Sequence, residues 1–218
     1  MTIAVVRYLS ADLLRSQRFI VPLLTYGVLL AVLFGGNPGP PPAPWAASTL
    51  ALYPISAWLA ITTANTEDPT QRHITIAATG GWLPVAGGVL LTCLLGDLTL
   101  VAISVLWPLI PIITVTYPYP AQVLLAGALA HLTSATTGTA IGLLCARPLI
   151  TRFGWTILTT LIVLLVTAVQ PWLPPVGTAV KALTDTSIPI GHLALDTALG
   201  LALAGIACTV TIIVSHRR

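Results

Sequence analysis

The sequence predicts an all-α integral membrane protein with six transmembrane helices. Of its 218 residues, 56% are hydrophobic and only 7% are charged, and a soluble domain of this size could not bury so much apolar surface. The apolar residues fall into six segments, and eight of the nine basic residues lie in gaps on one side of a six-span threading. Because Lys and Arg in short loops are retained in the cytoplasm, both termini are expected there, with the chain in the cell (plasma or inner) membrane. The eight are Arg7, Arg15, Arg18, Arg72, Arg147, Arg152, Arg217 and Arg218, whereas Lys181 lies on the opposite side.

The first 34 residues divide into an entry segment and a span. Residues 1–18 are predicted to form an amphipathic cytoplasmic segment. Its apolar side carries Val5, Val6, Leu9, Leu13 and Leu14, and its polar side carries Arg7, Arg15 and Arg18. Residues 19–34 form the first predicted span. A cleaved signal peptide is the alternative, but the region before the apolar core is long and no small-x-small cleavage site follows it.

A Gly/Pro turn at residues 35–44 leads to the second span at 45–63, and residues 65–81 then form a cytoplasmic segment. Asp68 is a predicted N-cap, Pro69 occupies the first turn, and Gln71 is the N3 residue of a capping box. Gly80 and Gly81 stop the helix. The resulting helix, Pro69–Thr79, has about eleven residues and a length of roughly 16 Å, far too short to cross a bilayer.

Residues 83–113 are apolar apart from Gly96 and Asp97, so they form either one long span or two short spans with a turn. Two spans would move Arg147 and Arg152 to the outside, which favours a single third span. The remaining spans are predicted at 122–145, 153–169 and 192–214. Residues 170–191 form an outer segment, rich in Pro and half apolar, that is expected to be partly buried where protein shields its backbone. Residues 1–218 thus make one transmembrane domain.

Small residues recur every four positions in the fourth predicted span. They line one face with side chains that allow two helix backbones to approach closely. The face could pack within the chain or form a seam between two copies, and the spacing is compatible with both. The four residues are Ala130, Ser134, Gly138 and Gly142.

Several motifs of catalysis and binding are absent from the sequence. The sole lysine, Lys181, is followed by Ala182, so there is no phosphate-binding loop and the chain is not expected to hydrolyse ATP alone. There is no paired-histidine zinc helix, nucleophile elbow or carboxylate cluster, so no catalytic or metal-binding residue is predicted. The scattered basic residues indicate topology rather than nucleic-acid binding. Cys93, Cys145 and Cys208 lie in apolar stretches without the spacing of a disulfide framework or a zinc site.

The entry segment, six spans, capped cytoplasmic helix and part-apolar outer segment occur here in one order. In this layout the chain resembles, over nearly all of its length, a permease subunit of the ABC export class, which includes polysaccharide, drug and peptide exporters. The resemblance implies that Pro69–Thr79 is a coupling helix that contacts a separate ATPase. The matching positions are Glu67, Asp68, Gln71, Arg72 and His73.

The resemblance also implies the partners. Two permease copies, expected as a homodimer in the bilayer, would enclose the translocation path, and two ATPase subunits would bind ATP and Mg, leaving this chain without a cofactor. An ATP-independent channel or secondary carrier is the alternative function, and a membrane enzyme is a third.

Four ionisable residues at membrane depth are candidates for a path or gate: Asp97, His131, His192 and Asp196. Such residues are costly in a bilayer and usually face protein or water. Asp97 either lines the path or bonds to a neighbouring helix, and His131 is either a site or a satisfied structural residue. His192 and Asp196 are four residues apart, which predicts a hydrogen-bonded pair or an exit-gate contact.

Overall fold

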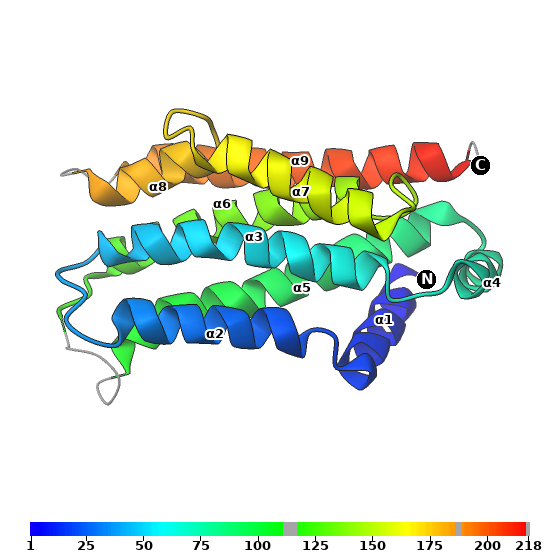
Figure 1. Ribbon diagram of the computed structural model, residues 1–218, viewed down its shortest axis with the longest axis horizontal. Coiled ribbons are helices and arrows are strands. Elements are labelled where there is room, and N and C mark those ends of the chain that lie inside the picture. The colour runs from blue at the N-terminus through cyan, green and yellow to red at the C-terminus, as the bar shows by residue number, and fades with distance from the viewer. Residues whose placement is uncertain (111–116, 186–188, 217–218) are drawn as a thin grey trace.

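Most of the helices run along the longest axis of the molecule, and two others, α1 (Thr2–Ser16) and α4 (Pro69–Thr79), lie across one end of them (Figure 1). The computed structural model describes residues 1–110, 117–185 and 189–216, and within these ranges the chain is helical with no strand. The helices are α1 (Thr2–Ser16), α2 (Ile20–Phe34), α3 (Pro44–Ala64), α4 (Pro69–Thr79), α5 (Trp82–Leu106), a 3-10 turn η1 (Trp107–Leu109), α6 (Ala121–Cys145), α7 (Phe153–Ala168), α8 (Val176–Thr184) and α9 (Ile190–His216).

All six predicted spans coincide with helices, but they differ in length. Among the described residues, four segments are long and apolar enough to cross a membrane, namely α3, α5 with η1, α6 and α9. The bent pair of α1 and α2 would make a fifth, and α7 is a shorter apolar helix. With 15 residues, α2 has a length of about 23 Å, which is less than the roughly 30 Å of a hydrocarbon core.

The entry segment ends at a sharp bend. Gln17 adopts a φ of 56°, in the left-handed region, so α1 stops there and α2 continues at 74° to it. One side of α1 packs on α5 through Val5 and Leu9, both buried. Gly88 makes room for this contact, because a Cβ there would lie 2.5 Å from Val5 Cγ1. Leu14, predicted on the same side as Val5, is 62% exposed and does not join the packed face.

The third predicted span is continuous through Gly96 and Asp97, so the alternative of two short spans with a turn there is wrong. Gly96 serves close packing instead, because a Cβ at this position would lie 2.7 Å from Leu59 Cδ2 on α3. The helix ends in η1, and residues 111–113 of the predicted span lie outside the described residues.

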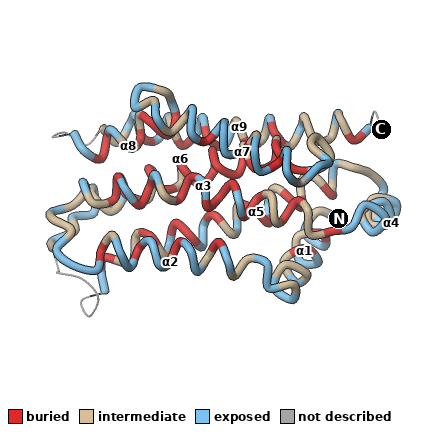
Figure 2. Tube along the Cα trace, viewed as in Figure 1, coloured by how far each residue is buried: buried red, intermediate tan, exposed pale blue. Residues whose placement is uncertain are grey.

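The centre of the bundle is α6, which packs along α3 on one side and α9 on the other. Burial is concentrated along these helices (Figure 2). A Cβ at Gly138 would clash with the Tyr53 carbonyl, one at Gly142 with Ala57 and Ala60, and one at Gly200 of α9 with Thr136. The predicted stripe of Ala130, Ser134, Gly138 and Gly142 is therefore buried inside the chain, so it has no surface left for a seam between copies.

Part of the 170–191 segment is buried, as the sequence predicts. It contains α8, whose Val176, Ala179 and Leu183 are buried against α6, α3 and α9. Protein contacts therefore cover one side of this short helix, while Lys181 and Thr184 face outward. Residues 186–188 lie outside the described part of the chain.

The contact between α3 and α6 predicts a position-specific effect of adding one methyl group. Gly142→Ala places a Cβ 2.8 Å from that of Ala60 and should lower the free energy of unfolding by about 1–3 kcal/mol. In Gly205→Ala the new Cβ meets no atom within 4 Å, so this matched variant should melt at or slightly above the wild-type temperature, since Ala favours helix. Thermal unfolding in mild detergent measures both, and equal melting temperatures would contradict the packing argument.

Candidate functional site

The candidate site is α4, which lies at one end of the bundle with α1 and the end of α9 (Figure 1). It begins and ends where the sequence predicts. The Asp68 carboxylate accepts a hydrogen bond from the Thr70 N–H at 3.3 Å, and Gly80 ends the helix with a φ of 78°. No residue of α4 is buried. It is thus a short capped helix with one face exposed.

A buried carboxylate anchors the beginning of α4. Glu67 is only 4% exposed, and its Oε1 accepts a hydrogen bond from Thr75 Oγ1 at 2.7 Å. Its Oε2 lies 3.9 Å from Arg72 Nε, an ion-pair distance. Burial lowers the pKa of Arg72, the charge of Glu67 opposes that shift, and the charge of Arg147 adds to it. Glu67 and Arg72, both proposed from the sequence as ATPase contacts, are therefore directed at each other rather than at a partner.

Gln71 connects α4 to α1. Its Nε2 donates a hydrogen bond to the Tyr8 hydroxyl, so its side chain does not turn back to complete the predicted capping box. Tertiary contact provides a different partner here, because α1 brings Tyr8 alongside α4. Burial raises the pKa of Tyr8, and the nearby charges of Glu67 and Asp12 raise it further, so the hydroxyl stays protonated at neutral pH.

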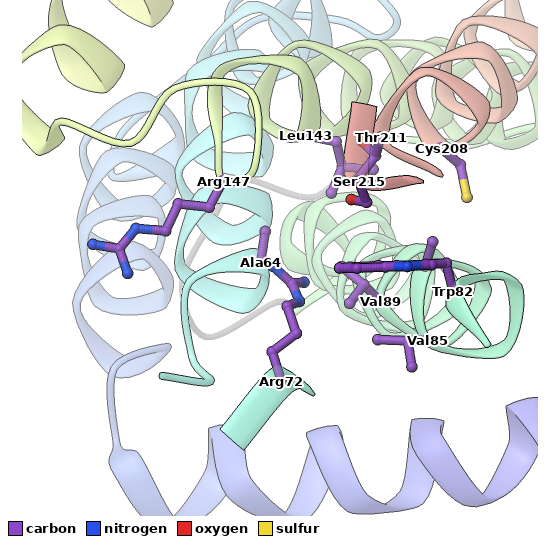
Figure 3. Close-up of a pocket in the computed structure, with 11 residues that line it drawn as sticks. Ala64, Arg72, Trp82, Val85, Val89, Leu143, Arg147, Cys208, Thr211 and Ser215 are labelled. Atoms are coloured by element: carbon purple, nitrogen blue, oxygen red, sulfur yellow. The ribbon is translucent and has the colours of Figure 1, made fainter. Parts of the chain in front are cut away.

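A row of rings connects α4 to α5 and α9. The His73 and Trp82 ring centroids are 6.2 Å apart in an edge-to-face arrangement, and those of Trp82 and His216 are 6.3 Å apart. Trp82 also lines a pocket of about 20 Å³, together with Arg72 and Ser215 (Figure 3). This volume has room for about one water molecule. The α4 helix therefore contacts α1 and α5, and Trp82 of α5 connects it in turn to α9.

The exposed face of α4 differs from the sequence-based expectation. Of the five predicted contact residues, Asp68, Gln71 and His73 are exposed. Ile74 was not predicted, yet it is 65% exposed at the centre of this face. Its signal in the sequence is an isolated large apolar residue in a short polar helix. A large exposed apolar side chain is available to enter the apolar core of a protein interface.

Asp97 is buried in the middle of the bundle. Its Oδ2 accepts a hydrogen bond from Thr139 Oγ1 of α6 at 2.6 Å, whereas its Oδ1 is buried without a hydrogen-bond partner among the described residues. The carboxylate thus bonds to a neighbouring helix, one of the two roles that the sequence left open.

His131 is fully buried, and both ring nitrogens have partners. Nδ1 lies 2.7 Å from the Gly127 carbonyl, and Nε2 lies 2.9 Å from Ser48 Oγ on α3. Because a carbonyl only accepts, Nδ1 carries a hydrogen that it donates to the Gly127 carbonyl. These contacts suit a structural residue that joins α3 and α6.

His192 and Asp196 do not form the predicted hydrogen-bonded pair. Asp196 Oδ2 accepts from Thr178 Oγ1 of α8 at 2.8 Å, and His192 is exposed. The reason is that α8 packs beside α9 and presents a hydroxyl to the carboxylate. Asp196 therefore joins α8 to α9.

A groove of about 750 Å³ opens between α3 and α7, near the beginning of α2. Its volume lies within the roughly 300–1,000 Å³ typical of ligand sites. Arg18 and Arg147 line it together with apolar and threonine side chains. Neither Asp97 nor His131 contributes to the lining. Sequence reasoning missed this groove because its walls come from segments far apart in the chain.

The link between Tyr8 and Gln71 predicts local rather than global loosening on mutation. Tyr8→Phe removes the oxygen that accepts from Gln71, so amide hydrogen exchange in α4 should become several-fold faster with little change in melting temperature. Tyr117→Phe is the matched control, because its hydroxyl bonds to Asn37 at the other end of the bundle. Exchange mass spectrometry in detergent checks both variants, and unchanged exchange in α4 of Tyr8→Phe would show that the link does not order the helix.

The contact between Asp97 and Thr139 predicts a global effect. Thr139→Val removes the hydroxyl that donates to Asp97 Oδ2, and the loss should cost about 1–3 kcal/mol of unfolding free energy. Thr99→Val makes the same chemical change at an exposed position of α5 and should have little effect. Melting temperatures in mild detergent compare the two, and equal shifts would refute a stabilising role for this bond.

Comparison with protein-family models, with curated proteins and with solved structures found no match to this chain.

Proposed function

We propose that this chain is the membrane-spanning subunit of an ATP-driven ABC transporter, acting as an exporter with a separate ATPase. The observation that carries the proposal is α4, a short capped helix at the end of the bundle, with no buried residue of its own but with contacts to α1 and α5 and, through Trp82 of α5, a connection to α9. A helix of this kind can pass a rigid-body movement to the bundle without fraying.

The exposed face of α4 supplies the proposed contact with the ATPase. Asp68, Gln71, His73 and Ile74 are all exposed, so together they offer polar groups and one large apolar side chain to a partner. Glu67 and Arg72 have a different proposed role, since their buried contact sets the orientation of α4 on the bundle. Motion of the ATPase would reach α5 and α9 through His73, Trp82 and His216.

The proposed topology has six spans with both termini in the cytoplasm. It is supported by the position of the N-terminus, α4 and the end of α9 at the same end of the bundle (Figure 1), and by the basic residues near that end. The short helices α2 and α7 would cross with help from flanking residues, because long side chains such as Arg18 reach the interface and a bilayer can thin locally.

A second copy is proposed at the face formed by α2, α3 and α7. The α7 helix is only loosely attached to its own chain, and Leu161, Ile162, Leu165 and Val166 are all more than half exposed. A partner copy would cover these residues and close the groove between α3 and α7 into part of a translocation path. ATP and Mg would bind to the two ATPase subunits.

The test is co-purification from the native cell in mild detergent. We expect an ATPase with a phosphate-binding loop to co-purify, and we expect Ile74→Asp to reduce its recovery at least about tenfold, a loss of roughly 1.4 kcal/mol or more. Thr184→Asp is the control, because Thr184 is exposed on α8 at the opposite end of the bundle. Both variants should insert and melt as the wild type does.

Two outcomes would overturn the proposal. One is the absence of any such ATPase from the purified complex. The other is proton- or sodium-driven flux through liposomes that contain this chain alone, which would favour the ATP-independent carrier.

A further inference from the structure

The groove between α3 and α7 has one cationic end. Arg18 and Arg147 are both exposed there, and no Asp or Glu lines the groove. Neither guanidinium forms an ion pair or a side-chain hydrogen bond with any residue in the described ranges. Each guanidinium carries five N–H donors and no acceptor. This end of the groove therefore offers unused donors and positive charge to an anion.

The position of Arg147 follows from its backbone. Its N–H donates to Asn65 Oδ1 at 3.4 Å, which holds the loop after α6 beside the end of α3. Figure 3 shows the Arg147 side chain extending away from Arg72, and like-charge repulsion favours that separation. The Arg147 guanidinium is thus available to a ligand outside the bundle.

The rest of the groove is lined mainly by apolar side chains, with threonines and Asn65 among them. Trp58, Leu161 and Leu164 supply apolar surface. The hydroxyl of Thr62 donates to the Trp58 carbonyl at 2.9 Å and that of Thr160 to the Thr156 carbonyl at 2.6 Å, so these hydroxyl hydrogens are already used within their helices. This part of the lining suits hydrocarbon.

The depth of the groove matches one leaflet of a bilayer. On α3 its lining extends from Asn65 to Pro54, and eleven residues of helix rise about 16 Å. Half of a hydrocarbon core of roughly 30 Å is about 15 Å. A molecule with its charged group at Arg18 and Arg147 would therefore place an acyl chain alongside Trp58, within the same leaflet.

We propose that this groove is a binding site for an anionic phospholipid that enters from the leaflet at the arginine end. The phosphate group binds Arg18 and Arg147, because guanidinium groups pair with phosphate oxygens in a bidentate geometry, and an acyl chain lies between α3 and α7. The binding groups all belong to this chain, so the site does not depend on ATP-driven transport. A second copy at this face would enclose the lipid between two sets of arginines.

Trp58 serves as the reporter, because it is 43% exposed and lines the groove. The chain is reconstituted in phosphatidylcholine nanodiscs that contain a minor fraction of brominated phosphatidylglycerol or, in parallel, of brominated phosphatidylcholine. Bromine quenches only nearby tryptophans, and the signal of Trp58 is the difference between the wild type and Trp58→Phe. We expect stronger quenching by the anionic lipid, with an apparent preference of about fivefold for each arginine.

Three variants test the origin of the preference. The double variant Arg18→Gln/Arg147→Gln should quench equally with both lipids. Arg7→Gln/Arg15→Gln removes two exposed arginines of α1 and should keep the preference. Trp155 is 56% exposed on α7 and does not line the groove. The signal of Trp155, taken as the difference between the wild type and Trp155→Phe, should therefore be quenched equally by the two lipids. Circular dichroism checks that each variant retains its helix content.

Each contrary result has a clear meaning. Equal quenching of wild-type Trp58 by the two lipids would refute recognition of the head group. If Arg7→Gln/Arg15→Gln lost the lipid preference as fully as Arg18→Gln/Arg147→Gln, the preference would come from the general surface charge and not from the groove. Absence of quenching by either lipid would show that another molecule, such as a second copy of the chain, fills the groove. Any of these would overturn the proposal while leaving the co-purification test of the ATPase unaffected.

Discussion

The close approach of α6 to α3 and α9 is the contact on which the rest of the structure depends. It is possible because Gly138, Gly142 and Gly200 lack side chains where backbones meet. In a bilayer, association of helices gains little from the hydrophobic effect, so close van der Waals packing and interhelical hydrogen bonds must stabilise it. The bond of His131 to Ser48 connects α6 to α3, and that of Thr133 to Thr197 connects α6 to α9. Small residues and buried polar residues therefore act together. The glycines let the helix backbones come close, and the interhelical hydrogen bonds form only at that short separation.

The central packing also determines which helices remain at the periphery. Two faces of α6 are occupied by α3 and α9, so α7 makes few contacts with its own chain and buries only small parts of its surface, at Thr156, Thr160 and Leu164. Loose attachment of α7 leaves the groove beside α3 open. The proposed lipid site and the proposed contact with a second copy thus have one structural origin, namely the loose packing of α7 at the edge of the bundle.

The end of the bundle that carries α4 is organised on a different principle. There, the contacts are polar and aromatic: Glu67 with Thr75 and Arg72, Gln71 with Tyr8, and Trp82 with His73. These contacts fix α4 to the bundle, although Gln71 and His73 stay partly accessible, and they leave Ile74 exposed. A helix that is fixed on one side and exposed on the other is suited to transmit the movement of a partner, which connects this geometry to the proposed coupling role.

The sequence alone determined the long helices, α4 and their order, because hydropathy and local capping chemistry act over a few residues, but it did not identify α8 within the outer segment. Asp68, Pro69 and Gly80 defined α4 correctly for this reason. Tertiary structure decided which partner each polar side chain meets, since Gln71 binds Tyr8 and Asp196 binds Thr178 across long separations in the chain or between helices. It also decided that the small-residue stripe of α6 packs internally and that a groove forms beside α7. Spacing along one helix identifies a face, but the helix that covers that face is chosen by the packing of the whole bundle.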